Sequence, residues 1–395
     1  MRLAPEVYAE LDDRLAPTDA ELRRRYPDEP AGRQPVHTVY VPADRWHADL
    51  LARWRDEAFA ALAAHPPLPY PQELAGRVAA KLTAEPIEDL RIDFEDGYGI
   101  RDDAQEDAAA VAAGRAAAAA LRAGTAPPYL GIRCKSLEAR TRRRALRTVD
   151  MFLDGLGSPP PGFVITVPKV SAVAQAEAMD VLCGHLEDGY ALEPGRLRVE
   201  FQIETAQAVL GADGTATLAP LVHAAGGRCV GLVFGTYDYT AGLGVAAGYQ
   251  AMDHPAADHA KAVMQVAVAG TGARARLSDG STNVLPVGDT AAVQEAWRLH
   301  TRLVRRSLER GFYQGWDLHP AQLPTRFAAT YGFFRDGLAQ ARTRLSAYLA
   351  HRSSGIADEP ATARALAGFL LRGLECGAFD RAEAGHEPST LAVLR

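Results

Sequence analysis

The sequence has 395 residues, of which 48% are hydrophobic and 23% are charged, and its formal net charge is -6 with an isoelectric point near 6.0. This composition is typical of a soluble globular protein, and the acidic balance argues against nucleic acid or an acidic membrane as a partner. No apolar run reaches the roughly 18 residues of a membrane span, and the first residues lack the apolar core of a signal peptide. We therefore expect a cytoplasmic protein.

The chain divides into three predicted parts. Residues 1–35 carry a helical pattern around Val7, Leu11 and Leu15 and are predicted to be an N-terminal extension. From position 36, short strand-like runs alternate with longer helical stretches, which predicts a parallel sheet with crossover helices. Residues 326–395 are predicted to be a helical segment that caps the barrel or buries a subunit interface, and we expect a homo-oligomer.

Eight runs in residues 36–325 are strand candidates, and eight is the number that a (β/α)8 TIM-type barrel needs. An open doubly wound sheet is the alternative, but no glycine-rich dinucleotide fingerprint follows the first strand. The candidates are His37–Pro42, Asp89–Glu95, Tyr129–Cys134, Phe163–Val170, Leu197–Thr205, Cys229–Gly235, a weaker run at Ala273–Leu277, and Gly315–His319.

Two acidic residues follow successive strand candidates. Glu204 comes at the end of the fifth run and Asp238 comes just after the sixth. In a β/α barrel these positions lie at the catalytic end. A pair of carboxylates, completed by water and substrate oxygens, suits Mg²⁺ or Mn²⁺. The simpler interpretation is that Glu204 caps a helix or forms a salt bridge and that Asp238 caps a turn.

Three further acids stand at the end of the second run, followed by glycines that permit a sharp turn. If the strand extends that far, Asp93 and Glu95 share one face and Asp96 takes the other. Such residues either face a ligand or cap the next helix.

Basic residues close the third and fourth runs. Arg133 is suited to bind an anionic substrate such as a carboxylate, although it could instead pair with a neighbouring acid. Lys169 has the position of a Schiff-base lysine, but an ion pair with a nearby acid is the preferred interpretation. His319 is either a general base or a turn residue bonded to the backbone.

Seven short motifs occur in one order along most of the chain, and together they resemble the citrate lyase β-subunit-like branch of the aldolase, citrate lyase and malate synthase superfamily. They are Val39-Tyr-Val-Pro-Ala-Asp44, Asp93-Phe-Glu-Asp96, Ile132-Arg133, Val167-Pro-Lys-Val170, Ile203-Glu-Thr-Ala206, Gly235-Thr-Tyr-Asp238 and His319-Pro-Ala-Gln322.

The resemblance implies a modified (β/α)8 barrel that binds Mg²⁺, with Mn²⁺ as an alternative. It makes Glu204 and Asp238 the metal ligands and Arg133 the residue that binds a substrate carboxylate or enolate oxygen. The remaining catalytic residues that it implies are Glu95 and Asp96, which order water at the metal, and Lys169, which supports them.

The implied function is a divalent-metal-dependent carbon-carbon lyase. It would perform an aldol- or Claisen-type cleavage of a small carboxylated hydroxy acid or its thioester, through an enolate that the metal and Arg133 stabilise. Whether the acyl group is free, on coenzyme A or on a carrier protein stays open. The alternatives are a malate synthase-like condensation of acetyl-CoA with glyoxylate, and a non-catalytic barrel that binds a metal and a carboxylate.

Overall fold

Eight parallel strands form the centre of the molecule in a computed structural model that describes residues 3–27, 32–271, 275–350 and 359–394. Their order around the sheet is β7-β6-β5-β4-β3-β2-β1-β8. The strands are β1 (His37–Pro42), β2 (Asp89–Asp93), β3 (Tyr129–Arg133), β4 (Val164–Val167), β5 (Arg198–Ile203), β6 (Cys229–Phe234), β7 (Arg276–Ser278) and β8 (Gly315–Asp317).

The sheet curls into a nearly closed barrel. Strand β1 pairs in parallel with both β2 and β8, so the first and last strands meet. Strands β7 and β8 are joined by a single isolated bridge between Ser278 and Gln314, and the N–H of Asp279 donates to the carbonyl of Gln314 at 2.9 Å. The predicted (β/α)8 barrel is therefore confirmed, and the open doubly wound sheet is excluded.

Each predicted strand is present, but most end earlier than the sequence pattern suggested. Strand β4 stops at Val167, because Lys169 adopts a left-handed backbone conformation with a φ of 53° that no strand accommodates. The weak candidate at 273–277 corresponds to β7; its residues 273 and 274 lie outside the described part of the chain.

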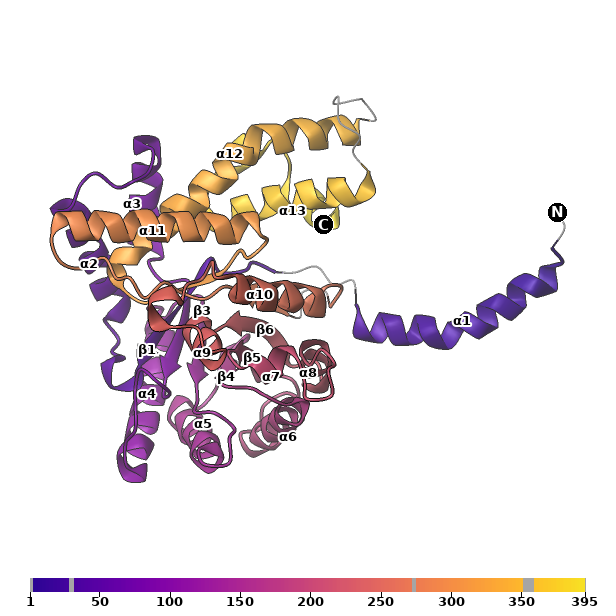
Figure 1. The fold of residues 1–395 in the computed structure, drawn as a ribbon, viewed down its shortest axis with the longest axis horizontal. Helices are drawn as coiled ribbons and strands as arrows, with labels where there is room; N and C mark the ends of the chain where they lie inside the picture. Colours follow the sequence, from indigo (N-terminus) through magenta and orange to yellow (C-terminus); the bar gives the residue numbers. More distant parts are fainter. Residues whose placement is uncertain (1–2, 28–31, 272–274, 351–358, 395) are drawn as a thin grey trace.

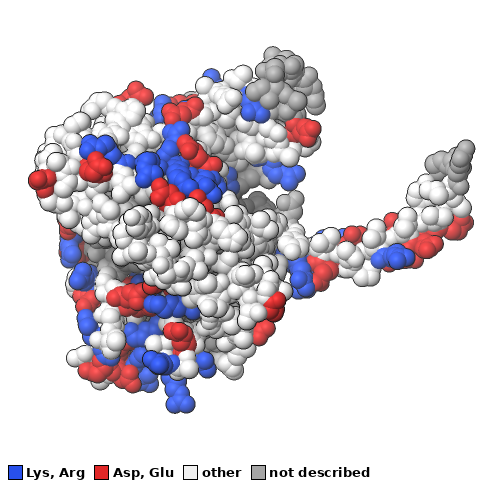
Figure 2. Space-filling view, in the orientation of Figure 1, with Lys and Arg blue, Asp and Glu red and all other residues white. Residues whose placement is uncertain are grey.

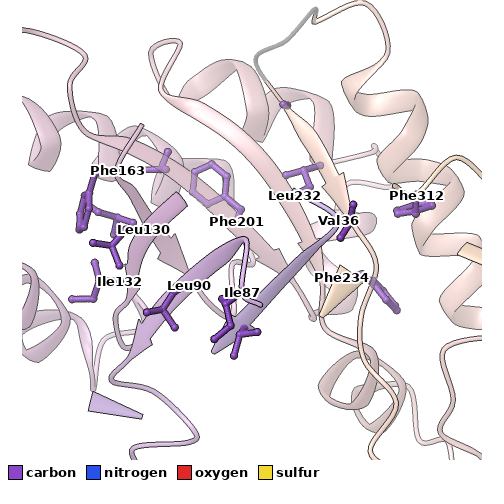
Figure 3. Packing of buried hydrophobic residues seen from close by; sticks show 14 of the residues in the cluster. Val36, Ile87, Leu90, Leu130, Ile132, Phe163, Phe201, Leu232, Phe234 and Phe312 are labelled. Carbon is purple, nitrogen blue, oxygen red and sulfur yellow. The ribbon is translucent and has the colours of Figure 1, made fainter. Parts of the chain in front are cut away.

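Alternation along the strands separates a polar barrel interior from an apolar outer layer. On β2, Asp89, Arg91 and Asp93 are bonded to polar groups on β1, β5 and β3 respectively, whereas Leu90 and Ile92 belong to the main hydrophobic cluster. Figure 3 shows this cluster from close by, with side chains from several strands packed together. The labelled residues are Val36, Ile87, Leu90, Leu130, Ile132, Phe163, Phe201, Leu232, Phe234 and Phe312.

Helices surround the barrel and extend beyond it. They are α1 (Pro5–Arg25), α2 (Leu50–Ala64), α3 (Ala75–Ala84), α4 (Asp103–Ala123), α5 (Arg142–Leu156), α6 (Val173–Gly189), α7 (Ala206–Val209), α8 (Leu218–Ala224), α9 (Thr236–Gly242), α10 (Pro255–Val268), α11 (Thr290–Glu309), α12 (Leu323–Leu349), α13 (Pro360–Cys376), α14 (Arg381–Ala384) and α15 (Pro388–Leu394), with short 3-10 turns η1 (Ala43–Arg45), η2 (Gln72–Leu74), η3 (Ala247–Tyr249) and η4 (Pro320–Gln322).

Two helical regions lie away from the barrel wall. The N-terminal half of α12 is buried against α3 and α11. Its C-terminal half pairs with α13 in an arm above the barrel (Figure 1). Helix α1 projects away from the body of the molecule and has no buried residue. Within the described ranges, no helix is long and apolar enough to cross a membrane.

Candidate functional site

The carboxyl ends of five neighbouring strands bring the predicted site residues together. In a parallel barrel all strands end at the same rim, so residues far apart in the sequence meet there. The residues are Glu95 and Asp96 after β2, Arg133 at the end of β3, Lys169 after β4, Glu204 after β5, and Asp238 in the first turn of α9 after β6.

Arg133 is held rigidly inside the barrel. Its Nε and Nη2 donate to the two carboxylate oxygens of Asp93 at 2.6 and 2.8 Å, and its Nη1 donates to Gln202 at 3.2 Å. The rings of Tyr40 and Trp316 lie 4.8 and 5.4 Å from the guanidinium carbon. Burial alone would lower the pKa of Arg133, but Asp93 raises it above its ordinary value, so the cation is permanent.

Gln202 links Arg133 to Glu204. It accepts from Arg133 through its Oε1 and donates through its Nε2 to Oε2 of Glu204 at 2.7 Å. The other oxygen of Glu204 accepts the backbone N–H of Lys169 at 2.7 Å. Both carboxylate oxygens of Glu204 are thus oriented by neighbours, and each retains a lone pair for a further partner.

The ammonium of Lys169 stands among carboxylates. It makes a very short contact with Glu95, donates to Asp96 at 3.0 Å and lies 4.0 Å from Oδ2 of Asp238. Burial would lower the pKa of Lys169, but the bonds to Glu95 and Asp96 raise it well above its usual range. The amine is therefore protonated, which is the ion-paired state and not the neutral state that a Schiff base requires.

Electrostatics single out Glu204. Burial, and then the charge of Asp238, raise the pKa of Glu204 to about 8. Burial also raises the pKa of Glu95, whereas bonds to Glu95 and Lys169 outweigh burial and lower that of Asp96. With Asp93 included, the site contains five carboxylates but only two cations, Arg133 and Lys169. The raised pKa of Glu204 therefore reflects burial first and this excess of negative charge second.

This donor set fits a divalent cation. Glu204 and Asp238 follow adjacent strands and would supply oxygen ligands, and a cation between them would offset the burial and repulsion that raise the pKa of Glu204. In the described part of the chain, no group of three or more His, Cys, Asp and Glu side chains is arranged to hold a metal. Water and substrate oxygens would have to complete the coordination, as the sequence prediction proposed.

Solvent exposure of the side chains increases from Arg133 and Glu204 to Asp238 and Asp96. Arg133 and Glu204 are each 3% exposed, whereas the side chains of Asp238 and Asp96 are 48% and 60% exposed. The hydroxyl of Thr236, two residues before Asp238, is buried without a hydrogen-bond partner. Asp96 and Asp238 are thus the solvent-facing acids of the site, and Glu204 and Arg133 are its buried residues.

Three more residues lie at this site, and the sequence pattern assigned no role to any of them. Gln202 bonds both Arg133 and Glu204, and the rings of Tyr40 and Trp316 lie against Arg133. Gln202 could have been found, because it lies two residues before Glu204 and so shares its face of β5. His319 accepts the N–H of Ala321 at 3.2 Å in a turn, as in its simpler interpretation.

The opposite end of the barrel contains a cavity of about 660 Å³. Its inner wall includes Asp89, Arg91 and Glu200, and Arg91 is paired with both acids. Charged groups that satisfy one another at the amino ends of barrel strands are typical of a stabilising layer. This cavity is therefore not the candidate catalytic site.

A family model described as a domain of unknown function, DUF6986, matches residues 15–395. The chain belongs to this family. No curated protein matches the sequence.

Solved structures share the barrel. Native malate synthase from Haloferax volcanii, at 3 mM glyoxylate, superposes with a TM-score of 0.54 and 16% identity over 76% of each chain. Protein CitE from Mycobacterium tuberculosis, in complex with magnesium, acetoacetate and coenzyme A, has a TM-score of 0.52 and 20% identity over 90% of this chain and 99% of that chain. At these identities, the likeness establishes the fold of this DUF6986 protein.

Proposed function

We propose that this protein is a divalent-metal-dependent carbon-carbon lyase that cleaves a small carboxylated hydroxy acid or its thioester. The observation that carries the proposal is the juxtaposition of Glu204 and Asp238, with the pKa of Glu204 raised to about 8 by burial and by Asp238. Such a pair requires a cation to be fully ionised near neutral pH. The barrel shared with CitE, crystallised with magnesium, supports the same assignment at the level of the fold.

Glu204 and Asp238 are the proposed ligands of Mg²⁺, with Mn²⁺ as an alternative. When bound, the ion would supply Lewis-acid stabilisation of the negative charge that develops beside a carbonyl during carbon-carbon cleavage. Gln202 and the backbone of Lys169 hold the Glu204 carboxylate in one orientation. Glu95 and Asp96 are proposed to orient water at the entrance, and Lys169 is proposed to support them through its contacts with both acids.

Arg133 is the proposed second source of positive charge. Asp93 fixes the guanidinium through two bonds, from Nε and Nη2. The remaining nitrogen, Nη1, faces Gln202 and Glu95 and forms the edge of the guanidinium away from Asp93. A fixed cation in a water-poor site stabilises developing charge without reorganising. The substrate carboxylate or enolate oxygen is proposed to lie at this edge.

A malate synthase-like condensation is the second candidate function, because the fold also superposes on a malate synthase. Condensation and cleavage would use the same charged groups, since both pass through an enolate at the same position. The two differ in substrates: condensation requires acetyl-CoA and glyoxylate together.

The deciding experiment is a product assay on a panel of hydroxy acids, free and as coenzyme A thioesters, with and without Mg²⁺. We expect metal-dependent release of pyruvate, glyoxylate or an acetyl thioester. Formation of malate from acetyl-CoA and glyoxylate would instead establish the condensation. Tight ligand binding without any product would show a non-catalytic binding barrel.

The ligand assignment is tested by Glu204→Gln and Asp238→Asn, with Asp213→Asn in an exposed turn as the matched control. Changing residues that only support a metal ligand costs about 10- to 100-fold in affinity, so loss of a ligand should cost at least that much. If both site variants bind metal as tightly as the parent protein, Glu204 and Asp238 are not the ligands.

A further inference from the structure

Helix α1 is a long helix that buries none of its side chains. It comprises 21 residues, which corresponds to about 30 Å, and none of them is buried. In Figure 1 it projects from the body of the molecule. Contact with the body occurs just past its end, where the ring of Tyr26 packs edge-on against His223 at 5.5 Å between centroids.

Most of the large apolar residues of α1 follow a seven-residue repeat. Spacings of four and three alternate along Ala4 at the N-cap, Tyr8, Leu11, Leu15, the polar Thr18 and Leu22. The mean spacing of 3.5 residues is that of a left-handed coiled coil, in which such a narrow seam faces a second helix. The large members of the seam are half exposed: Tyr8 by 46%, Leu11 by 50%, Leu15 by 51% and Leu22 by 49%.

We propose that α1 forms a parallel, in-register coiled coil with α1 of a second copy of this chain. In proteins, most of the stability of a helix comes from packing of its apolar face and not from the helix propensity of its sequence. The described part of the chain provides no such burial for α1. Pro17 lies on the outer side of the repeat, so it does not interrupt the seam.

The charges beside the seam select the parallel orientation. With Leu15 at position a and Leu11 at position d, Arg14 occupies position g and Asp19 occupies position e. In a parallel pair, a g residue faces the e residue five positions along the other helix, so Arg14 meets Asp19 of the second copy. An antiparallel pair would bring e positions together and would place Asp12 and Asp19 on facing edges. Acidic and basic groups alternate with uncharged surface along α1 in Figure 2.

Cysteine cross-linking of the full-length protein tests this geometry. Thr18→Cys places a thiol in the seam, and Ala20→Cys places one on the outer face as the matched control. The four native cysteines are buried and should not react. On mild oxidation we expect Thr18→Cys to form a covalent dimer and Ala20→Cys to stay monomeric on a non-reducing gel. Equal behaviour of the two variants, whether both cross-link or neither does, would overturn the proposal.

Two further sets of variants separate this seam from any other contact between copies. In the Thr18→Cys background, Leu11→Glu with Leu15→Glu should weaken the pair by more than about 100-fold, because charges would be buried. Arg14→Glu and Asp19→Arg should each slow cross-linking, and the double exchange should restore it. Undiminished cross-linking in the leucine variant, or no rescue by the exchange, would refute the parallel pair. None of these readouts depends on catalysis or metal binding.

Discussion

The backbone N–H of Lys169 donates a 2.7 Å hydrogen bond to Glu204 and thereby ties the end of β4 to the carboxylate after β5. Lys169 adopts a φ of 53° to make this contact, a conformation that L-residues seldom adopt. One residue therefore has two roles at the rim: its backbone orients Glu204, and its ammonium offsets the charge of Glu95 and Asp96.

The two roles of Lys169 can be separated by substitution. Lys169→Met removes the ammonium that lies 4.0 Å from Asp238, so we expect Mg²⁺ to bind more tightly, on the order of tenfold, while turnover falls. Lys169→Arg keeps the charge and should leave the affinity near that of the parent. Isothermal titration with Mg²⁺ measures the difference, and weaker binding by Lys169→Met would contradict the placement of the cation beside Asp238.

Metal affinity should depend on pH through Glu204. Because its pKa is raised to about 8, the folded protein holds a proton on Glu204 below that pH, and the cation must displace this proton. Affinity should therefore rise about tenfold per pH unit up to about pH 8 and then level off. In Asp238→Asn the loss of a neighbouring negative charge should move the plateau to lower pH. A flat profile in the parent protein would argue against Glu204 as a ligand.

Gly235 is packed against the Glu204 side chain. A Cβ added at Gly235 would lie 2.6 Å from both Cβ and Oε2 of Glu204, which is too close for any ordinary contact. Gly235→Ala should therefore displace the carboxylate and lower metal affinity about tenfold, or about 1.4 kcal/mol. Gly242→Ala is the matched control, because its Cβ would meet nothing within 4 Å. Equal affinities in the two variants would show that the position of Glu204 is not critical.

A buried charge network beside the barrel should dominate stability. Asp317 binds Arg326, His37 and His300, all almost inaccessible, and these groups outweigh burial and hold the pKa of Asp317 well below its ordinary value. Its contribution is present above the unfolded pKa near 3.8 and is lost as pH falls further.

Asp317→Asn should leave Arg326 as an unpaired buried charge and lower the free energy of unfolding by about 3–5 kcal/mol. Asp336→Asn removes the acid of an exposed pair with Arg305 and should cost less than about 1 kcal/mol. Urea denaturation at neutral pH compares the two variants. A loss no larger in Asp317→Asn than in Asp336→Asn would show that the network contributes little.

The sequence predicted the barrel well because strand and helix alternation is a local signal. It overestimated strand lengths, since apolar alternation continues past the residue where the backbone turns. At β4 the turn is caused by the left-handed conformation of Lys169, and a lysine gives no sign of that conformation in sequence.

The site was predictable to the extent that parallel strands share one rim. That rule was enough to group Glu204 with Asp238 and Arg133 at one end of the barrel. The contacts of Trp316 with Arg133, and the bond between His37 and Asp317 across 280 positions, depend on how distant elements pack. No local pattern encodes such pairs.

The single bridge between β7 and β8 bears on the order in which the barrel assembles. Strands β1 to β7 can add one after another as sequence neighbours, but β8 must find β1 across nearly the whole barrel sequence, which is the slowest kind of contact to form. We therefore expect ring closure at β8 to come late in folding. The backbone amides near Ser278 and Gln314 should then be among the first in the sheet to exchange with deuterium, because this joint can open without disturbing the other strand pairs.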